Sequence, residues 1–156
     1  MPYTDLLAAN RIVQIVEPAN RDQVLDAAAR LLSGHSPEWT QPIADGLRER
    51  EGVGSTGIGR GVAIPHCRSE ASREPVAAFL RLATPVDFGA HDGQPVDLVF
   101  AMAVPGDHAQ RHLDTLSELA GRFADADFRD SVRAARDITA LRNLLLHDGM
   151  RRSRRA

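Results

Sequence analysis

The segment Val96–Val104, VDLVFAMAV, most constrains what this chain can fold into, because every residue in it except Asp97 is apolar. A strand with one face in water alternates apolar and polar residues, whereas a near-continuous apolar run is typical of a central strand covered on both faces. Shorter apolar runs at 12–16, 62–64 and 76–82 are candidate neighbours. The sequence therefore predicts a sheet with helices on both of its faces.

Helix start signals lie between and after these strands. Asn20 is a predicted N-cap, and Gln23 stands three residues later as in a capping box. Ser36 and Pro37 predict a second helix, with proline at its first position, running into the stretch LRERE. The pattern predicts an α/β fold in which a mixed β-sheet is sandwiched between helices, as a three-layer structure.

Three further helices are predicted after the last strand. The first would be capped by Asp107, the second would lie around 128–135, and the third would run over 138–147 with Asp137 as its cap. The first of them has an apolar face made of Leu113, Leu116, Leu119, Ala120 and Phe123. We expect one domain over residues 1–148, followed by an arginine-rich, disordered tail over 149–156.

Composition excludes several classes of function. No apolar run approaches the roughly 20 residues that span a bilayer, so no membrane insertion is expected. The N-terminus lacks the pattern of a secretory signal, and the single cysteine, Cys67, fits a reducing compartment, so the expected location is cytoplasmic. The net charge of −2 gives no general attraction to nucleic acid. All 19 basic residues are arginine, which excludes a Walker A loop and a Schiff-base lysine.

The stretch Gly52–His66, GVGSTGIGRGVAIPH, carries the strongest chemical signal. Five glycines precede a short strand, and His66 follows it directly. Neutral imidazole is a nucleophile near pH 7. Arg50, the hydroxyl groups of Ser55 and Thr56, and the amide of Gly57 can supply hydrogen-bond donors to an anion. Phosphoryl transfer needs mainly an in-line nucleophile and such donors, so we predict that His66 accepts a phosphoryl group.

Other interpretations of these residues fit less well. GVGSTG matches a dinucleotide-binding pattern, but here the helix precedes the glycines and the strand follows, which reverses the required order. His108 and His112 have the spacing of a zinc-binding pair, but no carboxylate or third ligand accompanies them, so no metal is expected. Glu49 and Glu51 are predicted to form a solvated helix end, since residues two apart do not face each other on a helix.

The segment EREGVGSTGIGRGVAIPH resembles the signature of the enzyme IIA domains of the bacterial phosphotransferase system, in the mannitol/fructose and nitrogen-regulatory class. The stretches TPVDFGAHDGQPVDLVFAMAVP, HLDTLSELAGRFAD and FRDSVRAARD resemble the same family, so the similarity covers about Leu6 to Leu146. Cys67 stands where glycine commonly follows the histidine.

The resemblance implies a transferase component that acts as a stoichiometric phosphohistidine carrier and needs no cofactor. It implies that His66 is the phosphorylated residue, that His112 is the second active-site histidine, and that Arg50 is the active-site arginine. The implied donor is a small phosphocarrier protein similar to HPr. A stand-alone chain of this subtype suggests nitrogen or carbon regulation through target proteins. The alternatives are a sugar-specific component that serves a fructose- or mannitol-type permease subunit, and a purely regulatory binding module.

Overall fold

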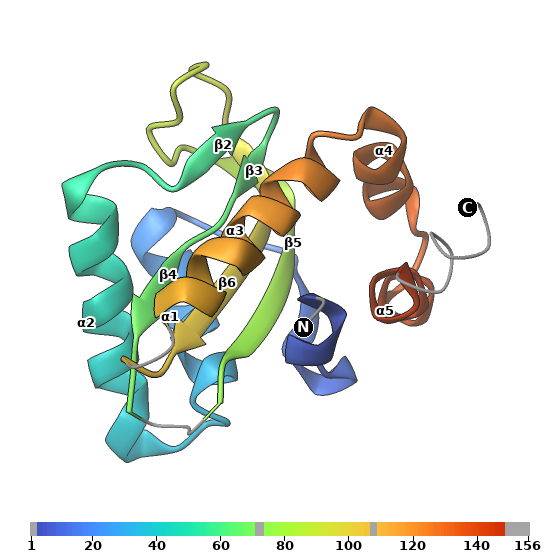
Figure 1. Cartoon of the computed structure of the whole chain (residues 1–156). Helices are drawn as coiled ribbons and strands as arrows, with labels where there is room; N and C mark the ends of the chain where they lie inside the picture. The colour runs from blue at the N-terminus through green and yellow to red at the C-terminus, as the bar shows by residue number, and fades with distance from the viewer. Residues whose placement is uncertain (1–2, 71–73, 107–108, 149–156) are drawn as a thin grey trace.

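A computed structural model describes residues 3–70, 74–106 and 109–148, with the backbone alone for 109–112 (Figure 1). Its centre is one six-stranded mixed sheet. The strands in spatial order are β1 (Ile12–Ile15), β5 (Val76–Val86), β6 (Val96–Val104), β3 (Val62–Ala63) and β2 (Gly57–Gly59). The sixth strand, β4 (His66–Arg68), also pairs with β6.

The apolar run that forms β6 is the central strand, as predicted. It pairs antiparallel with β5 and parallel with both β3 and β4. Its side chains alternate between two hydrophobic cores: Val99, Ala101 and Ala103 pack into one, and Leu98, Phe100 and Met102 into the other. Both faces of β6 are therefore covered.

Helices cover the two faces unequally (Figure 1). One core contains residues of α1 (Arg21–Leu32) and α2 (Pro37–Val53), and the other contains residues of α3 (Ala109–Phe123), α4 (Ala126–Ala134) and α5 (Ile138–Leu146). Two short N-terminal turns, η1 (Tyr3–Leu6) and η2 (Ala9–Arg11), precede β1, and η1 packs in the second core. The predicted three-layer α/β arrangement is confirmed.

The predicted helix starts are largely confirmed by hydrogen bonds. Asn20 accepts from the amide of Gln23 at 2.9 Å, and Asp137 accepts from the amide of Ala140 at 2.8 Å. Pro37 is the first residue of α2. The predicted cap Asp107 lies outside the described residues, as does the tail 149–156.

Three local details differ from what the sequence indicated or were not predicted. The predicted apolar face of α3 is buried at Leu119 and Phe123, but Leu113 is 60% exposed. The short strand β2 was not predicted, because its sequence, Gly57–Gly59, has none of the β-branched or aromatic alternation that marks strands. The helix α2 runs through Gly52 to Val53, two residues into the glycine-rich stretch.

A buried polar cluster joins the two ends of the described chain. Asp148 is 1% exposed and accepts hydrogen bonds from the Tyr3 hydroxyl and, in a bidentate arrangement, from the Arg122 guanidinium. The same guanidinium stacks over the ring of Phe128 at 3.8 Å from its centre. The C-terminal residue of the described chain is thereby fixed against α3 and the N-terminus. No helix within the described ranges is long and apolar enough to cross a membrane.

Candidate functional site

His66 lies where the chain leaves β3 and begins β4. Pro65 interrupts the strand, and its carbonyl accepts from the amide of Met102 at 3.0 Å. The chain then pairs with β6 again, with His66 level with Met102. His66 therefore begins a strand as well as following one, and the two pairings on each side of Pro65 fix its backbone.

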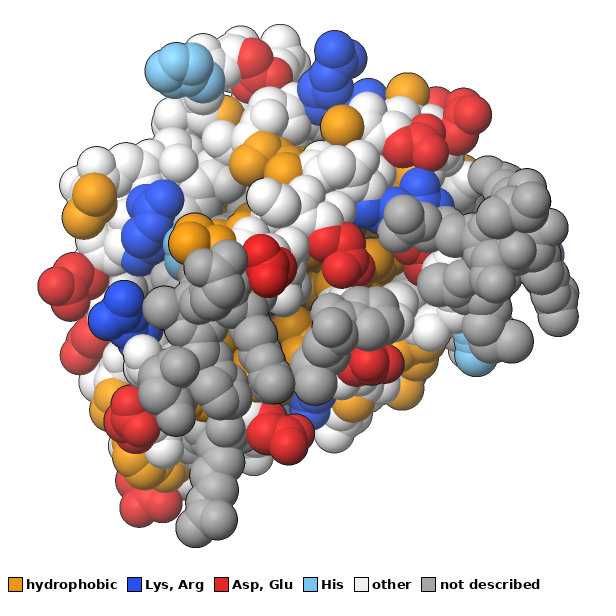
Figure 2. Space-filling model, viewed as in Figure 1, with side chains coloured by type: hydrophobic (Ala, Val, Ile, Leu, Met, Phe, Trp, Pro, Cys, Tyr) orange, Lys and Arg blue, Asp and Glu red, His pale blue; other side chains and the backbone are white. Residues whose placement is uncertain are grey.

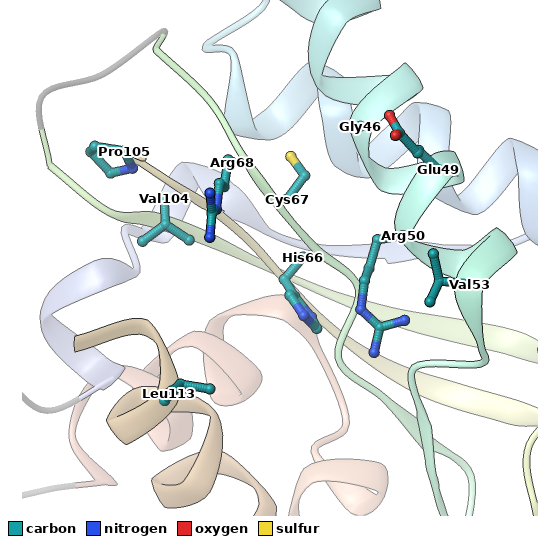
Figure 3. Close-up of a pocket in the computed structure, with 10 residues that line it drawn as sticks. All are labelled: Gly46, Glu49, Arg50, Val53, His66, Cys67, Arg68, Val104, Pro105 and Leu113. Carbon is teal, nitrogen blue, oxygen red and sulfur yellow. The ribbon is translucent and has the colours of Figure 1, made fainter. Parts of the chain in front are cut away.

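Strand alternation decides which side chains share the face of His66. Ile64 packs in the core below α3, whereas Cys67 packs in the core below α1 and α2. His66 and Arg68 are two residues apart and so face the same side of the strand. Figure 3 shows Cys67 pointing away from both of them. Burial raises the pKa of the Cys67 thiol to about 11, so the sulfur stays protonated near pH 7.

A cavity of about 540 Å³ opens beside His66. Residues from α2, β4, the end of β6 and α3 line it (Figure 3). They are Gly46, Glu49, Arg50, Val53, His66, Cys67, Arg68, Val104, Pro105 and Leu113. The two guanidinium groups and the imidazole make this a cavity suited to an anion.

The ring of His66 is oriented by its own backbone. Nδ1 lies 2.8 Å from the carbonyl oxygen of Ile64. Because a carbonyl can only accept, Nδ1 must carry the proton in this hydrogen bond. In the neutral ring the lone pair is then on Nε2, the nitrogen remote from the backbone.

The pKa of His66 is lowered from its usual 6.5. Desolvation by burial is the largest cause, and the positive charge of Arg50 acts in the same direction. The hydrogen bond to Ile64 and the charge of Glu51 act in the opposite direction. The imidazole is therefore neutral, and nucleophilic at Nε2, over a wider pH range than a histidine in water.

Arg50 reaches the cavity from the last turn of α2. Its Nη1 donates to the carbonyl of Gly54 at 2.7 Å, just beyond the C-terminus of the helix. A guanidinium has five N–H donors, so one such bond orients the group and leaves donors for a ligand. In Figure 3 the guanidinium extends from α2 toward the side of the strand that carries His66. The structure thus brings together the predicted pair Arg50 and His66.

Glu51 is not the solvated residue that the sequence predicted. It is 5% exposed, and its carboxylate accepts from both the amide and the hydroxyl of Thr56. Ser55 donates to the carbonyl of Phe88 at 2.6 Å and accepts from the amide of Gly57 at 3.0 Å. The hydroxyls of Ser55 and Thr56 and the amide of Gly57 are therefore engaged in shaping the loop. Their role as phosphoryl donors stays a prediction, and it requires these bonds to be exchanged.

The glycines of this loop permit close contact with the protein's own chain. A Cβ at Gly57 would lie 2.8 Å from the Cβ of Ala90, closer than side chains approach. A Cβ at Gly61 would lie 2.5 Å from Nη2 of Arg133, and Gly61 has φ +81°. At these two positions the glycines therefore allow the loop to pack closely against the 88–97 segment and α4.

His112 belongs to α3, but its side chain lies outside the described residues, and His108 lies outside them altogether. The predicted contact between His112 and His66 therefore stays a prediction. Among the described residues, no group of three or more histidine, cysteine or acidic side chains is placed to hold a metal ion.

Two features of the cavity were not predicted from the sequence. Arg68 lines it on the same face as His66, which the two-residue spacing in a strand could have indicated. Val53 and Leu113, 83% and 60% exposed, flank the opening with apolar surface. On the face shown in Figure 2, blue arginine side chains gather at the left beside a partly covered histidine and orange hydrophobic side chains, where Figure 1 has α2.

Comparisons with known proteins agree with the geometry. Residues 5–148 match the family described as "Phosphoenolpyruvate-dependent sugar phosphotransferase system, EIIA 2". A nitrogen regulatory protein of Pseudomonas aeruginosa is 39% identical over 142 residues, covering 90% of this chain and 92% of the relative. A fructose-specific EIIA component of Haloferax volcanii is 37% identical over 101 residues, covering 65% and 66%. The crystal structure of the nitrogen regulatory protein IIA-Ntr of Neisseria meningitidis superposes with a TM-score of 0.84 at 35% identity, covering 92% and 98%.

Proposed function

Because the chain belongs to the EIIA type 2 family and is thus a phosphoryl carrier of the phosphoenolpyruvate-dependent phosphotransferase system, we propose that His66 is its phosphoryl acceptor, with Nε2 as the reacting atom. The observation that carries the proposal is the hydrogen bond from Nδ1 to Ile64. It assigns the lone pair of the neutral ring to the nitrogen remote from the backbone. The lowered pKa of His66 keeps Nε2 unprotonated near pH 7.

The proposed step is a direct transfer between two imidazoles. The Nε2 lone pair of His66 forms a new N–P bond as the P–N bond of the donor's phosphohistidine breaks, and the donor nitrogen keeps that electron pair. The ring of His66 gains positive charge, which the Ile64 carbonyl stabilises through the Nδ1 proton. Neither His66 nor the donor histidine needs an external base, because no proton moves in the transfer itself.

Arg50 and Arg68 are the proposed partners of the phosphoryl oxygens. Both line the cavity with His66, and a guanidinium forks onto two oxygens at once. His112 is a proposed third contact, carried by the family resemblance. Ser55, Thr56 and Gly57 keep their proposed donor role only if the loop exchanges its present bonds.

As an EIIA component, the chain has other proteins of the phosphotransferase system as its partners. We propose that the donor is a small HPr-like phosphocarrier and that it docks over the apolar rim of Val53 and Leu113. We further propose a regulatory role, supported by the nitrogen regulatory name of the relatives from Pseudomonas aeruginosa and Neisseria meningitidis. The second candidate function is a role in sugar transport, which is supported by the relative named as a fructose-specific component.

The test of the acceptor is incubation with a charged HPr-like carrier, followed by intact mass measurement. The wild type should gain one phosphoryl group, and the label should be lost in acid and kept in base, as a P–N bond requires. His66→Ala should gain none, whereas His91→Ala, which removes an exposed histidine, should behave as the wild type. Labelling of His66→Ala, or an acid-stable label, would overturn the assignment.

The same assay tests Arg50. Arg50→Lys should slow the acceptance of the phosphoryl group by roughly tenfold or more, because an ammonium cannot copy the fork geometry. Arg48→Lys is the matched control on the same helix, since Arg48 pairs with Asp22, Asp26 and Asp45 outside the cavity. Equal rates of phosphoryl acceptance for the two variants would show that Arg50 does not contact the phosphoryl group.

The regulatory role predicts that phosphorylation changes which proteins bind. A phosphoryl group adds about −1.5 to −2 charges between the exposed side chains of Val53 and Leu113. A partner with an apolar or acidic surface would lose affinity, whereas one that presents arginine would gain it. Affinity capture with unmodified and phosphorylated protein should therefore recover different partners. Identical partner sets, together with transfer to a fructose-type permease subunit, would favour the sugar-specific role.

A further inference from the structure

A second cavity, of about 760 Å³, lies at the other end of β6 from His66. His66 is level with Met102, and Asp97 stands five residues earlier in the same strand, which corresponds to roughly 16 Å. The lining comes from the β2–β3 turn, the β5–β6 connection, the start of β6, and α4. Its charged and amide side chains are Arg60, Asp92, Gln94, Asp97, Arg129 and Arg133.

Arg129 is the unusual member of this cavity. It is only 6% exposed, yet the part of the chain that the structure describes gives its side chain one hydrogen bond, from Nη1 to the carbonyl of Phe123 at 2.7 Å. It has no carboxylate partner there. A buried guanidinium with most of its five donors unused costs free energy unless an anion accepts from them.

The other charges of the cavity are already balanced. Arg133, one helical turn after Arg129, forms a bidentate ion pair with Asp97 and donates to the carbonyl of Arg60. Asp92 accepts from the amides of Arg60 and Gln94, and the positive charge of the Arg60 side chain acts on the Asp92 carboxylate to lower its pKa. The charge of Arg129 is therefore the one that a ligand would complement.

We propose that this cavity binds a small phosphomonoester, with the guanidinium of Arg129 on the phosphate. A guanidinium fork matches two phosphate oxygens, and the burial of Arg129 strengthens such charge-assisted bonds. The carboxylate of Asp92 and the amide of Gln94 can accept and donate hydrogen bonds to hydroxyl groups of the rest of the ligand. The ligand class is thus a hydroxylated metabolite that carries one phosphate.

This site is independent of the phosphoryl transfer at His66. It uses none of the residues that line the His66 cavity. The two cavities share only β6, which contributes Asp97 at one end and Val104 at the other. Occupancy of this cavity would depend on the concentration of a phosphorylated metabolite, whereas the modification of His66 depends on the supply of phosphoryl groups.

The test on the wild-type protein is an NMR titration at constant ionic strength with inorganic phosphate, glucose 6-phosphate and glucose. Glucose 6-phosphate should shift the amide signals of Gly59, Gly61 and Arg133 saturably, and inorganic phosphate should shift the same signals. Glucose alone should not. Shifts confined to Cys67 and Arg68, which report the His66 cavity, would overturn the proposal, as would equal binding of glucose or no binding at all.

A variant makes the test specific to Arg129. Arg129→Gln should weaken glucose 6-phosphate binding by roughly tenfold or more, the usual value of a charge-assisted hydrogen bond. Arg136→Gln, which removes an arginine whose side chain is 92% exposed, is the matched control and should bind as the wild type. Phosphoryl acceptance at His66 should persist in both variants. A folded Arg129→Gln protein with unchanged binding would overturn the proposal, and if that variant does not fold, the wild-type titration decides alone.

Discussion

The backbone hydrogen bond and the burial of His66 act on its protonation in opposite directions. The Ile64 carbonyl favours the imidazolium, whereas desolvation and the charge of Arg50 disfavour it, and the net effect is a lowered pKa. The unfolded chain therefore binds this proton at a higher pH than the folded chain does. As the pH falls below 6.5, the unfolded state takes up the proton first, and the folded state loses stability until its own, lower pKa is reached.

This balance predicts how His66 titrates. Its imidazole signals in NMR should show a midpoint below pH 6.5, with the signals assigned by their loss in His66→Ala. Arg50→Gln should move the midpoint of that titration upward, because it removes a charge that lowers the pKa of His66. Arg68→Gln is the control from the same cavity and should move the midpoint less. A midpoint at or above 6.5 in the wild type would contradict the geometry described here.

At the scale of elements, the sequence predicted those helices and strands whose signals are local. Asn20, Pro37 and Asp137 mark helix starts by chemistry that acts within one turn, and the apolar run of β6 marks its own burial. The pair Arg50 and His66 was predicted from the residue types and the family resemblance. Arg68 was missed, because its two-residue spacing from His66 indicates a shared face only if strand pairing resumes after Pro65, which the sequence analysis did not predict.

Long-range contacts explain the other differences. Glu51 looks like a solvated residue until the loop folds back and Thr56 donates to it. Arg81 sits in the apolar strand β5 and is 9% exposed, because it donates to Gln14 and to the carbonyls of Val132 and Ala135. A sequence pattern does not reveal which distant acceptor will satisfy a buried arginine.

The β2–β3 turn predicts a specific cost for one substitution. Gly59, Arg60 and Gly61 all have positive φ, and a Cβ at Gly61 would also collide with the ion pair of Arg133. Gly61→Ala should lower the free energy of unfolding by about 2–3 kcal/mol. Gly93→Ala has similar backbone strain, at φ +72°, but no atom within 4 Å, and should cost about 1 kcal/mol. Urea unfolding measures the free energy of unfolding of both variants. Equal decreases would show that the atoms near Gly61 move aside without a loss of stability.

At the scale of the whole molecule, two layers of helices are fixed to one sheet, and Asp148 connects the two ends of the described residues. The buried carboxylate of Asp148 accepts hydrogen bonds from the hydroxyl of Tyr3, in η1, and from the guanidinium of Arg122, in α3. Burial and the contact with Asp148 raise the pKa of Tyr3 well above its usual value of 10.0, so its hydroxyl remains a donor. The cluster therefore stabilises the second core where Tyr3 and Asp148 meet.

Removing that carboxylate should destabilise the protein globally. Asp148→Asn should lower the free energy of unfolding by about 3 kcal/mol or more, because it leaves Arg122 buried beside a neutral partner. Tyr3→Phe should cost about 1 kcal/mol, the usual net value of one hydrogen bond. Arg48→Gln, which removes a more exposed arginine from its ion pairs, is the control and should cost less than 1 kcal/mol. Chemical denaturation gives all three values, and a loss for Asp148→Asn no larger than that for Arg48→Gln would contradict the role of the cluster.

The parallel pairing of β1 with β5 affects how the protein folds during translation. Ile12 pairs with Phe79, and Tyr3 bonds with Asp148, so these two segments need partners that are translated much later than they are. At about 5–20 residues per second, β1 waits roughly 3–13 s for its neighbour. During that interval β1 lacks its neighbouring strand, although the described helices α1 and α2 between β1 and β5 are already synthesised. Pairing between residues far apart in the sequence also slows refolding, because the chain loses loop entropy before the contacts between the paired strands stabilise it.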